Sequence, residues 1–117
     1  MSLFDQLGGE PKLRAIVDDF VDRCFDDVMI GFMFARAERG RIKRFEYQHA
    51  ASHLGGPVEY GGRPLDEAHR PHQIFGGQFD RRRRILIETL RDHGAPSEVI
   101  DAWVSHQDSL RPLITKH

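Results

Sequence analysis

The sequence is poor in the features that mark secreted, membrane-spanning or nucleic-acid-binding proteins. Its single cysteine, Cys24, cannot form an internal disulfide, which fits a reducing compartment. No apolar run approaches the roughly 20 residues of a spanning helix, and residues 1–5 lack the charged and apolar zones of a secretion signal. Lys and Arg number 17 against 18 Asp and Glu, so a net charge of −1 favours neither nucleic acid nor an anionic membrane. These absences predict a soluble, cytoplasmic protein.

Strand signals are also scarce, whereas apolar residues often recur at helical spacing. The 117 residues are enough for one core and too few for a second, so we expect one domain, residues 1–117. The spacing predicts an all-α fold with four substantial helices: from near Pro11 to about Phe25, from about Ala37 to Leu54, from the Gly76-Gly77 break to His93, and from Pro96 through Ile114. Between the first two, the apolar segment 28–34 is too short for an independent helix.

His69 is the strongest candidate ligand in the chain. It ends the run Arg63-Pro64-Leu65-Asp66-Glu67-Ala68-His69, which follows the glycine-rich stretch 54–62 and precedes Pro71. We predict a short, stiff helix here, and a rigid backbone lowers the entropy cost of presenting an imidazole to a metal. A surface or capping histidine is the alternative reading of the same residue.

The predicted helix 37–54 has an unusually polar face. Its apolar positions Ile42, Phe45 and Ala50 share that face with three polar residues, Glu46, His49 and His53. His49 and His53 lie four residues apart, so they could present two imidazoles to one non-heme metal, together with His69 and His72. Such a pair is more often half-exposed and inert.

Other distinctive residues have structural explanations. The run Arg81-Arg82-Arg83-Arg84 points around a helix axis, so we expect a solvated face with ion pairs to Asp66, Glu67, Asp80 or Glu88. Cys24 and Trp103 fall on apolar faces, which predicts an inert buried thiol and a core indole.

The order of short motifs along the chain resembles the truncated hemoglobins, most closely their first group. The matching elements cover nearly the whole sequence, and the spacing between them is kept. They are Leu7-Gly8-Gly9, Phe20, the segment from Asp26-Asp27 to Phe34, Leu54-Gly55-Gly56-Pro57, Tyr60-Gly61-Gly62-Arg63-Pro64, Ala68-His69, Phe79-Asp80 and Gly94-Ala95-Pro96. No single motif is decisive, but their common order makes the resemblance strong.

The resemblance implies a two-over-two helical sandwich around a b-type heme, with His69 as the axial ligand of the iron. Phe34 would stack on the porphyrin, and a basic residue among Arg41, Lys43 and Arg44 could pair with a propionate. Apolar side chains would keep water from the iron. The implied cofactor-binding set is His69, Phe34, Ile42, Phe45, Glu46, His49, Ile74, Phe79 and Leu86.

The ligand side departs from the family pattern. Directly after the residue equivalent to Phe20, relatives usually carry a tyrosine, and the tyrosine hydroxyl donates a hydrogen bond to the bound gas. This chain has Val21 at that position. The helix positions that usually face the gas are here Ile42, Glu46 and His49. The Glu46 carboxylate would repel the partial negative charge of iron-bound oxygen, unless Glu46 is protonated or paired with a basic residue. His49 is the better donor, and Tyr47 or Gln48 could donate only if the helix is rotated.

The resemblance implies reversible binding of oxygen, nitric oxide or carbon monoxide, for oxygen handling or nitric oxide detoxification. Nitric oxide dioxygenation would need an electron-donating reductase as partner, and a peroxidase-like activity is a further option. Two alternatives remain: a heme-free or ligand-sensing globin domain, and a non-heme metal protein built on the histidines.

Overall fold

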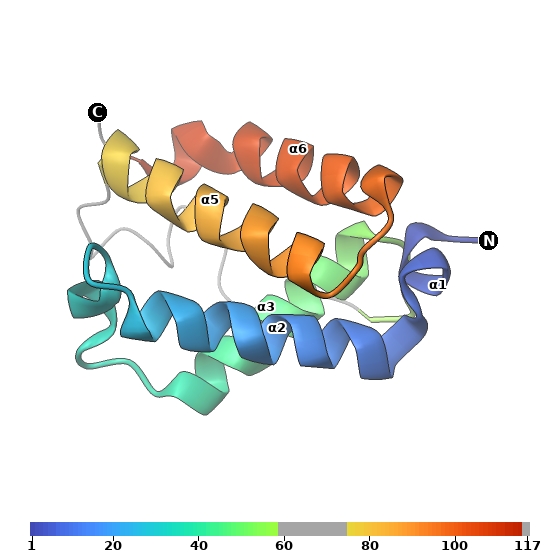
Figure 1. The fold of residues 1–117 in the computed structure, drawn as a ribbon, viewed down its shortest axis with the longest axis horizontal. Helices are drawn as coiled ribbons and strands as arrows, with labels where there is room; N and C mark the ends of the chain where they lie inside the picture. The colour runs from blue at the N-terminus through green and yellow to red at the C-terminus, as the bar shows by residue number, and fades with distance from the viewer. Residues whose placement is uncertain (59–74, 116–117) are drawn as a thin grey trace.

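The computed structural model describes residues 1–58 and 75–115, which contain helices and turns but no strand. The helices are α1 (Leu3–Leu7), α2 (Gly9–Asp26), the short 3-10 helix η1 (Gly31–Phe34), α3 (Arg39–His53), α5 (Gly76–Asp92) and α6 (Ser97–Ile114) (Figure 1). The prediction of an all-α fold with four substantial helices is therefore confirmed. One boundary was wrong: Gly76 and Gly77 form the first turn of α5 instead of a break before it.

Helix α2 is the central element of the fold. It packs against α3 on one side and α5 on the other, and α5 in turn packs along α6. Figure 1 shows α2 crossing in front of α3, with α5 and α6 running side by side above them. Two pairs of helices therefore face each other, which is the predicted two-over-two sandwich.

The apolar stripe of α2 explains its central place. Six side chains at helical spacing are fully or almost fully buried: Leu13, Ile16, Val17, Phe20, Val21 and Cys24. Each large apolar side chain that leaves water contributes roughly 1.5–3 kcal/mol before entropy is counted. Trp103 of α6 is 1% exposed in the same core. The predictions of a buried Cys24 and a core Trp103 are confirmed.

Helix α1 was not predicted. The Ser2 hydroxyl accepts a hydrogen bond from the Asp5 backbone N–H at 3.1 Å, which caps the helix. Gly8 follows with φ of +122°, a conformation that side chains rarely adopt, and separates α1 from α2. The Phe4 N–H donates to the Leu54 carbonyl at 3.0 Å, so α1 is tied to the end of α3.

The four arginines at the start of α5 form ion pairs, but mostly with unexpected partners. Arg84 pairs with an acid predicted for it, Glu88 one turn further on, whereas Asp66 and Glu67 lie outside the described residues. The other three reach acids on separate elements, namely Asp27 for Arg81, Glu46 for Arg82 and Asp108 for Arg83, whereas Asp80 pairs with Arg111. Arg81, Arg82 and Arg83 face neighbouring elements, which spacing within α5 cannot reveal.

Within residues 1–58 and 75–115, no helix is both long enough and apolar enough to cross a membrane.

Candidate functional site

Helix α3 has one face committed to the core and a second face that is only partly covered. Four of its residues or near neighbours are buried toward the core: Tyr47, Ala50, Ala51 and Leu54. Five half-buried residues share the other face: Ile42, Phe45, Glu46, His49 and His53. Ala50 therefore belongs to the core face and not, as predicted, to the polar one.

Tyr47 lies on the α2 side of α3. Its side chain is 5% exposed, and the Arg14 guanidinium lies 4.1 Å from its ring centroid. Helix α3 is therefore not rotated in the way that would turn the Tyr47 hydroxyl toward the opposite face. This leaves the positions named by the resemblance, Ile42, Glu46 and His49, together on the half-buried face.

The Glu46 carboxylate has a basic partner. Arg82 of α5 donates through Nη2 to Glu46 Oε1 at 2.6 Å, and through Nη1 to Gln107 Oε1 of α6, also at 2.6 Å. The condition set by sequence reasoning, that Glu46 be paired with a base, is thus met. Neither Arg82 nor Gln107 was predicted at this site, because nothing in their spacing relates them to Glu46.

Three histidines meet between α3 and α6. Nε2 of His49 lies 3.3 Å from Nε2 of His106, and the His53 ring stacks on His106 with centroids 4.1 Å apart. His53 also meets Trp103 edge to face at 6.0 Å. Sequence reasoning missed His106, although its position three residues after the core residue Trp103 places it near the same face of α6.

Burial dominates the electrostatics of this histidine cluster. Burial, together with the neighbouring His106 and His49, lowers the pKa of His53 to about 3. Burial also lowers the pKa of His106. His53 is therefore neutral near pH 7, and its buried Nε2 atom has no hydrogen-bond partner in the part of the chain that the structure describes.

The predicted aromatic and apolar contacts occupy different surroundings. Phe34 is half-buried and stacks on Phe25, with centroids 4.7 Å apart and an interplanar angle of 17°. Phe79 is 2% exposed, and the Arg111 guanidinium lies 5.0 Å from its ring centroid. Leu86 is completely buried in the main core.

Two residues of the predicted set, His69 and Ile74, lie outside the described residues. The same is true of His72, Asp66, Glu67 and the short helix expected around His69. In the part of the chain that the structure describes, no group of three or more His, Cys, Asp or Glu side chains is arranged to hold a metal ion. Axial ligation by His69 therefore stays a prediction, and so does a metal site that includes His69 and His72.

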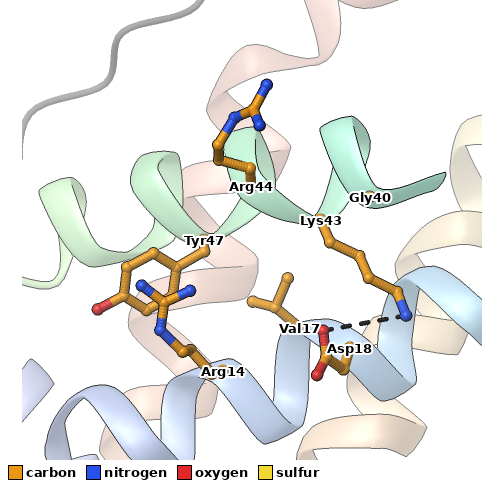
Figure 2. Close-up of a pocket in the computed structure, with 7 residues that line it drawn as sticks. All are labelled: Arg14, Val17, Asp18, Gly40, Lys43, Arg44 and Tyr47. Carbon is orange, nitrogen blue, oxygen red and sulfur yellow. Dashed lines mark ion pairs between the residues drawn. The ribbon is translucent and has the colours of Figure 1, made fainter. Parts of the chain in front are cut away.

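A groove of about 340 Å³ lies between α2 and α3, lined by Arg14, Val17, Asp18, Gly40, Lys43, Arg44 and Tyr47 (Figure 2). It is on the Tyr47 side of α3, away from the half-buried face. Lys43 Nζ lies 3.0 Å from an Asp22 oxygen and 3.9 Å from an Asp18 oxygen. Since acids of α2 already neutralise Lys43, the groove is a surface feature of the α2–α3 contact, and we do not assign it a ligand.

The sandwich and its half-buried α3 face define the class of protein. Residues 2–115 match the family model for bacterial-like globins, so the chain belongs to that family. More particularly, its relatives include group 1 truncated hemoglobins. It is 29% identical to GlbN of Mycolicibacterium paratuberculosis over 113 residues, covering 97% of this chain and 83% of the relative. It is also 29% identical to GlbN of a Nostoc species over 117 residues, covering 97% and 96%.

The same fold is found in a solved structure. The truncated hemoglobin of Tetrahymena pyriformis, crystallised in its Fe(III) form, superposes with a TM-score of 0.92 over the full length of both chains. At 23% sequence identity this likeness concerns the fold alone.

Proposed function

We propose that this chain is a heme-binding truncated hemoglobin that reversibly binds a diatomic gas. The family match over residues 2–115 carries the proposal. The relatives named group 1 truncated hemoglobin cover nearly the same length of chain, which supports the same function over one globin domain of residues 1–117.

The described residues fit such a cofactor. The α3 face that does not pack on α2 is half-buried and carries apolar side chains, Ile42 and Phe45, beside polar ones. On the same face, His53 Nε2 is a buried polar atom with no hydrogen-bond partner among residues 1–58 and 75–115, which is costly unless another group completes the site. A flat group that is mostly apolar with polar edges suits this face.

Bound heme would supply an iron that binds the gas. The proposed axial ligand is His69, whose neutral imidazole is a good donor to iron. Phe34, Ile42, Phe45, Phe79, Leu86 and Ile74 would line the cofactor and exclude water. Glu46 is held by Arg82, so its negative charge is neutralised on the ligand side. His49 remains a proposed donor to the gas, although its Nε2 already lies 3.3 Å from His106 Nε2.

Absorption spectroscopy tests the proposal. The purified protein, supplied with one equivalent of heme, should give a Soret band that shifts on reduction and again on addition of carbon monoxide. The variant His69→Ala should lose the ferrous spectrum of an imidazole-ligated heme, whereas His72→Ala should keep it. A wild-type protein without a Soret band, or an unchanged His69→Ala spectrum, contradicts the proposal. Stoichiometric zinc without porphyrin would favour the non-heme alternative.

We further propose a cytoplasmic location, supported by the single buried cysteine. Nitric oxide dioxygenation would additionally require an electron-donating reductase. Reduction of the heme-loaded protein by a flavin reductase and NADH, followed by consumption of nitric oxide and oxygen together with formation of nitrate, is the measurement for that activity.

A further inference from the structure

One polar bridge joins three helices on the ligand side of the proposed site. The Arg82 guanidinium of α5 donates to Glu46 of α3 and to Gln107 of α6, with both donor–acceptor distances at 2.6 Å. Charge-assisted bonds this short are stronger than neutral ones and fix the plane of the guanidinium. The two acceptors therefore hold Arg82 in one orientation between α3 and α6.

The bridge lies beside the part of α2 that includes Val21. The Arg82 guanidinium is 4.9 Å from the ring centroid of Phe20, the residue before Val21. Cys24, one turn further along α2, is also within electrostatic reach. Burial raises the pKa of its thiol to about 12, while the charges of Arg82 and Glu46 act on it in opposite directions. The Arg82 cation thus lies against the residue that precedes Val21, the position where relatives usually carry a tyrosine.

The side chains of the bridge are largely buried but keep some contact with solvent. The side chains of Arg82 and Glu46 are 24% and 23% exposed, and Gln107 is 4% exposed. A guanidinium carries further N–H groups beyond the two that bind Glu46 and Gln107. In a partly desolvated site, such donors interact more strongly with a negative or strongly polar ligand than they do in water.

We propose that Arg82, oriented by Glu46 and Gln107, is the ligand-side hydrogen-bond donor of this globin and selects small anionic ligands of the ferric heme, of which azide is the test case. This inference rests on the proposed heme-binding function. The structure favours Arg82 over His49 in this role, because Nε2 of His49 lies within 3.3 Å of His106 Nε2. Glu46 weakens the preference for anionic ligands, because its carboxylate offsets part of the positive charge of Arg82.

Azide titration of the heme-loaded ferric protein, followed by absorption, is the test. Removal of one charged donor in Arg82→Met should weaken azide binding by roughly tenfold or more. Glu46→Gln should leave binding unchanged or tighten it, because the guanidinium keeps its charge and loses its neutralising partner. A bridge that only ties the helices together predicts instead that Arg82→Met and Glu46→Gln change azide binding in the same direction.

The matched control is Arg83→Met, which removes the neighbouring arginine of the same helix and its ion pair with Asp108. Azide binding should not change in this variant. A second readout is the stretching frequency of carbon monoxide on the ferrous protein, which a nearby positive charge lowers and which Arg82→Met should therefore raise. If Arg82→Met does not fold, Arg82→Lys keeps the charge but loses the planar fork, and should weaken azide binding less than tenfold.

The outcomes separate the two proposals. A normal Soret band with azide affinity and carbon monoxide frequency unchanged in the Arg82 variants overturns the role of Arg82 and leaves heme binding intact. Absence of a Soret band in the wild-type protein overturns both.

Discussion

Asp27 shows how a single carboxylate ties two elements together. Its side chain is 6% exposed and accepts hydrogen bonds from the backbone N–H groups of Met29 and Ile30, as well as from Arg81 of α5. The Arg81 guanidinium is the main cause that keeps the pKa of Asp27 below its usual range, so the carboxylate is charged at neutral pH. It caps the turn after α2 and anchors α5 at the same time.

The variant Asp27→Ala is therefore expected to lower the free energy of unfolding by about 2 kcal/mol, because several hydrogen bonds to one charged carboxylate are lost together. The neighbouring Asp26, whose side chain is 73% exposed, offers a matched control. Asp26→Ala should change stability by less than about 0.5 kcal/mol. Urea unfolding of both variants checks this, and equal effects would show that Asp27 has no special role.

His53 gives the protein a sensitivity to mild acid. Burial lowers its pKa in the folded chain to about 3, against an ordinary value near 6.5. Since the unfolded chain binds the proton more readily, this contribution to stability is present above pH 6.5 and is lost as the pH falls toward 3. Between pH 7 and pH 5 the loss from His53 is at most about 2 kcal/mol.

Replacement of His53 by phenylalanine removes the proton and keeps a ring to stack on His106. His53→Phe should lose less stability between pH 7 and pH 5 than the wild-type protein, as measured by denaturant unfolding at both values. A pH dependence that is identical in the two proteins would contradict the assignment to His53.

The residues that were predicted correctly differ from those that were missed in how far along the sequence their contacts lie. Cys24 and Trp103 were correctly assigned to the core because the apolar periodicity around them is local information. Arg82, Gln107 and His106 were missed because their roles depend on contacts across 25 to 57 positions of sequence. Spacing along one helix says nothing about which helix packs opposite.

Among the elements, the link between α2 and η1 has the least freedom. Gly31 N–H donates to the Asp27 carbonyl at 2.8 Å, and a Cβ at position 31 would stand 2.5 Å from the backbone oxygen of Phe25. Because the obstacle is backbone at the end of α2, it cannot rotate away as a flexible side chain would. The turn into η1 therefore requires glycine for close approach.

Gly31→Ala should accordingly destabilise the fold by about 1–3 kcal/mol, the usual cost of forcing extra volume into a packed site. At Gly77, in the first turn of α5, an added Cβ would meet no atom of the described residues within 4 Å, and the backbone has no positive φ. Gly77→Ala should therefore be neutral or stabilising by up to about 1 kcal/mol, because alanine restricts the unfolded chain. Thermal unfolding of the two variants distinguishes the sites, and a stable Gly31→Ala would show that the turn can relax.

Element prediction followed the strength of the hydrophobic pattern. Helix α2 was placed within about two residues at each end, because six buried side chains repeat at helical spacing. Helix α1 was missed because five residues are too few to show a period. The feature that could have revealed α1 is its N-terminal cap, because a serine followed three residues later by an acidic residue, here Ser2 and Asp5, is typical of a helix start.

For the whole molecule, the order of motifs predicted the architecture better than any one of them. Leu7-Gly8-Gly9 and Gly94-Ala95-Pro96 each mark a junction that the structure confirms, between α1 and α2 and between α5 and α6. The bridge formed by Arg82, Glu46 and Gln107 was harder to predict, because it lies where α3, α5 and α6 converge. Glu46 and His49 could be named from the sequence, whereas the Arg82 guanidinium that neutralises Glu46 became evident only from the packing of the helices.

The proposed cofactor also makes a prediction about the stability of the whole protein. A ligand that binds only the folded state stabilises it by mass action, by about 4 kcal/mol when its free concentration is a thousand times its dissociation constant. Heme should therefore raise the unfolding midpoint of the wild-type protein, and the increase should become smaller in His69→Ala, because the axial bond contributes to affinity. Arg83→Met, altered only at the α5–α6 ion pair with Asp108, should keep the full heme-dependent increase. Midpoints measured with and without heme for all three proteins check this. An increase as large in His69→Ala as in the wild-type protein would mean that the iron is held through another side chain.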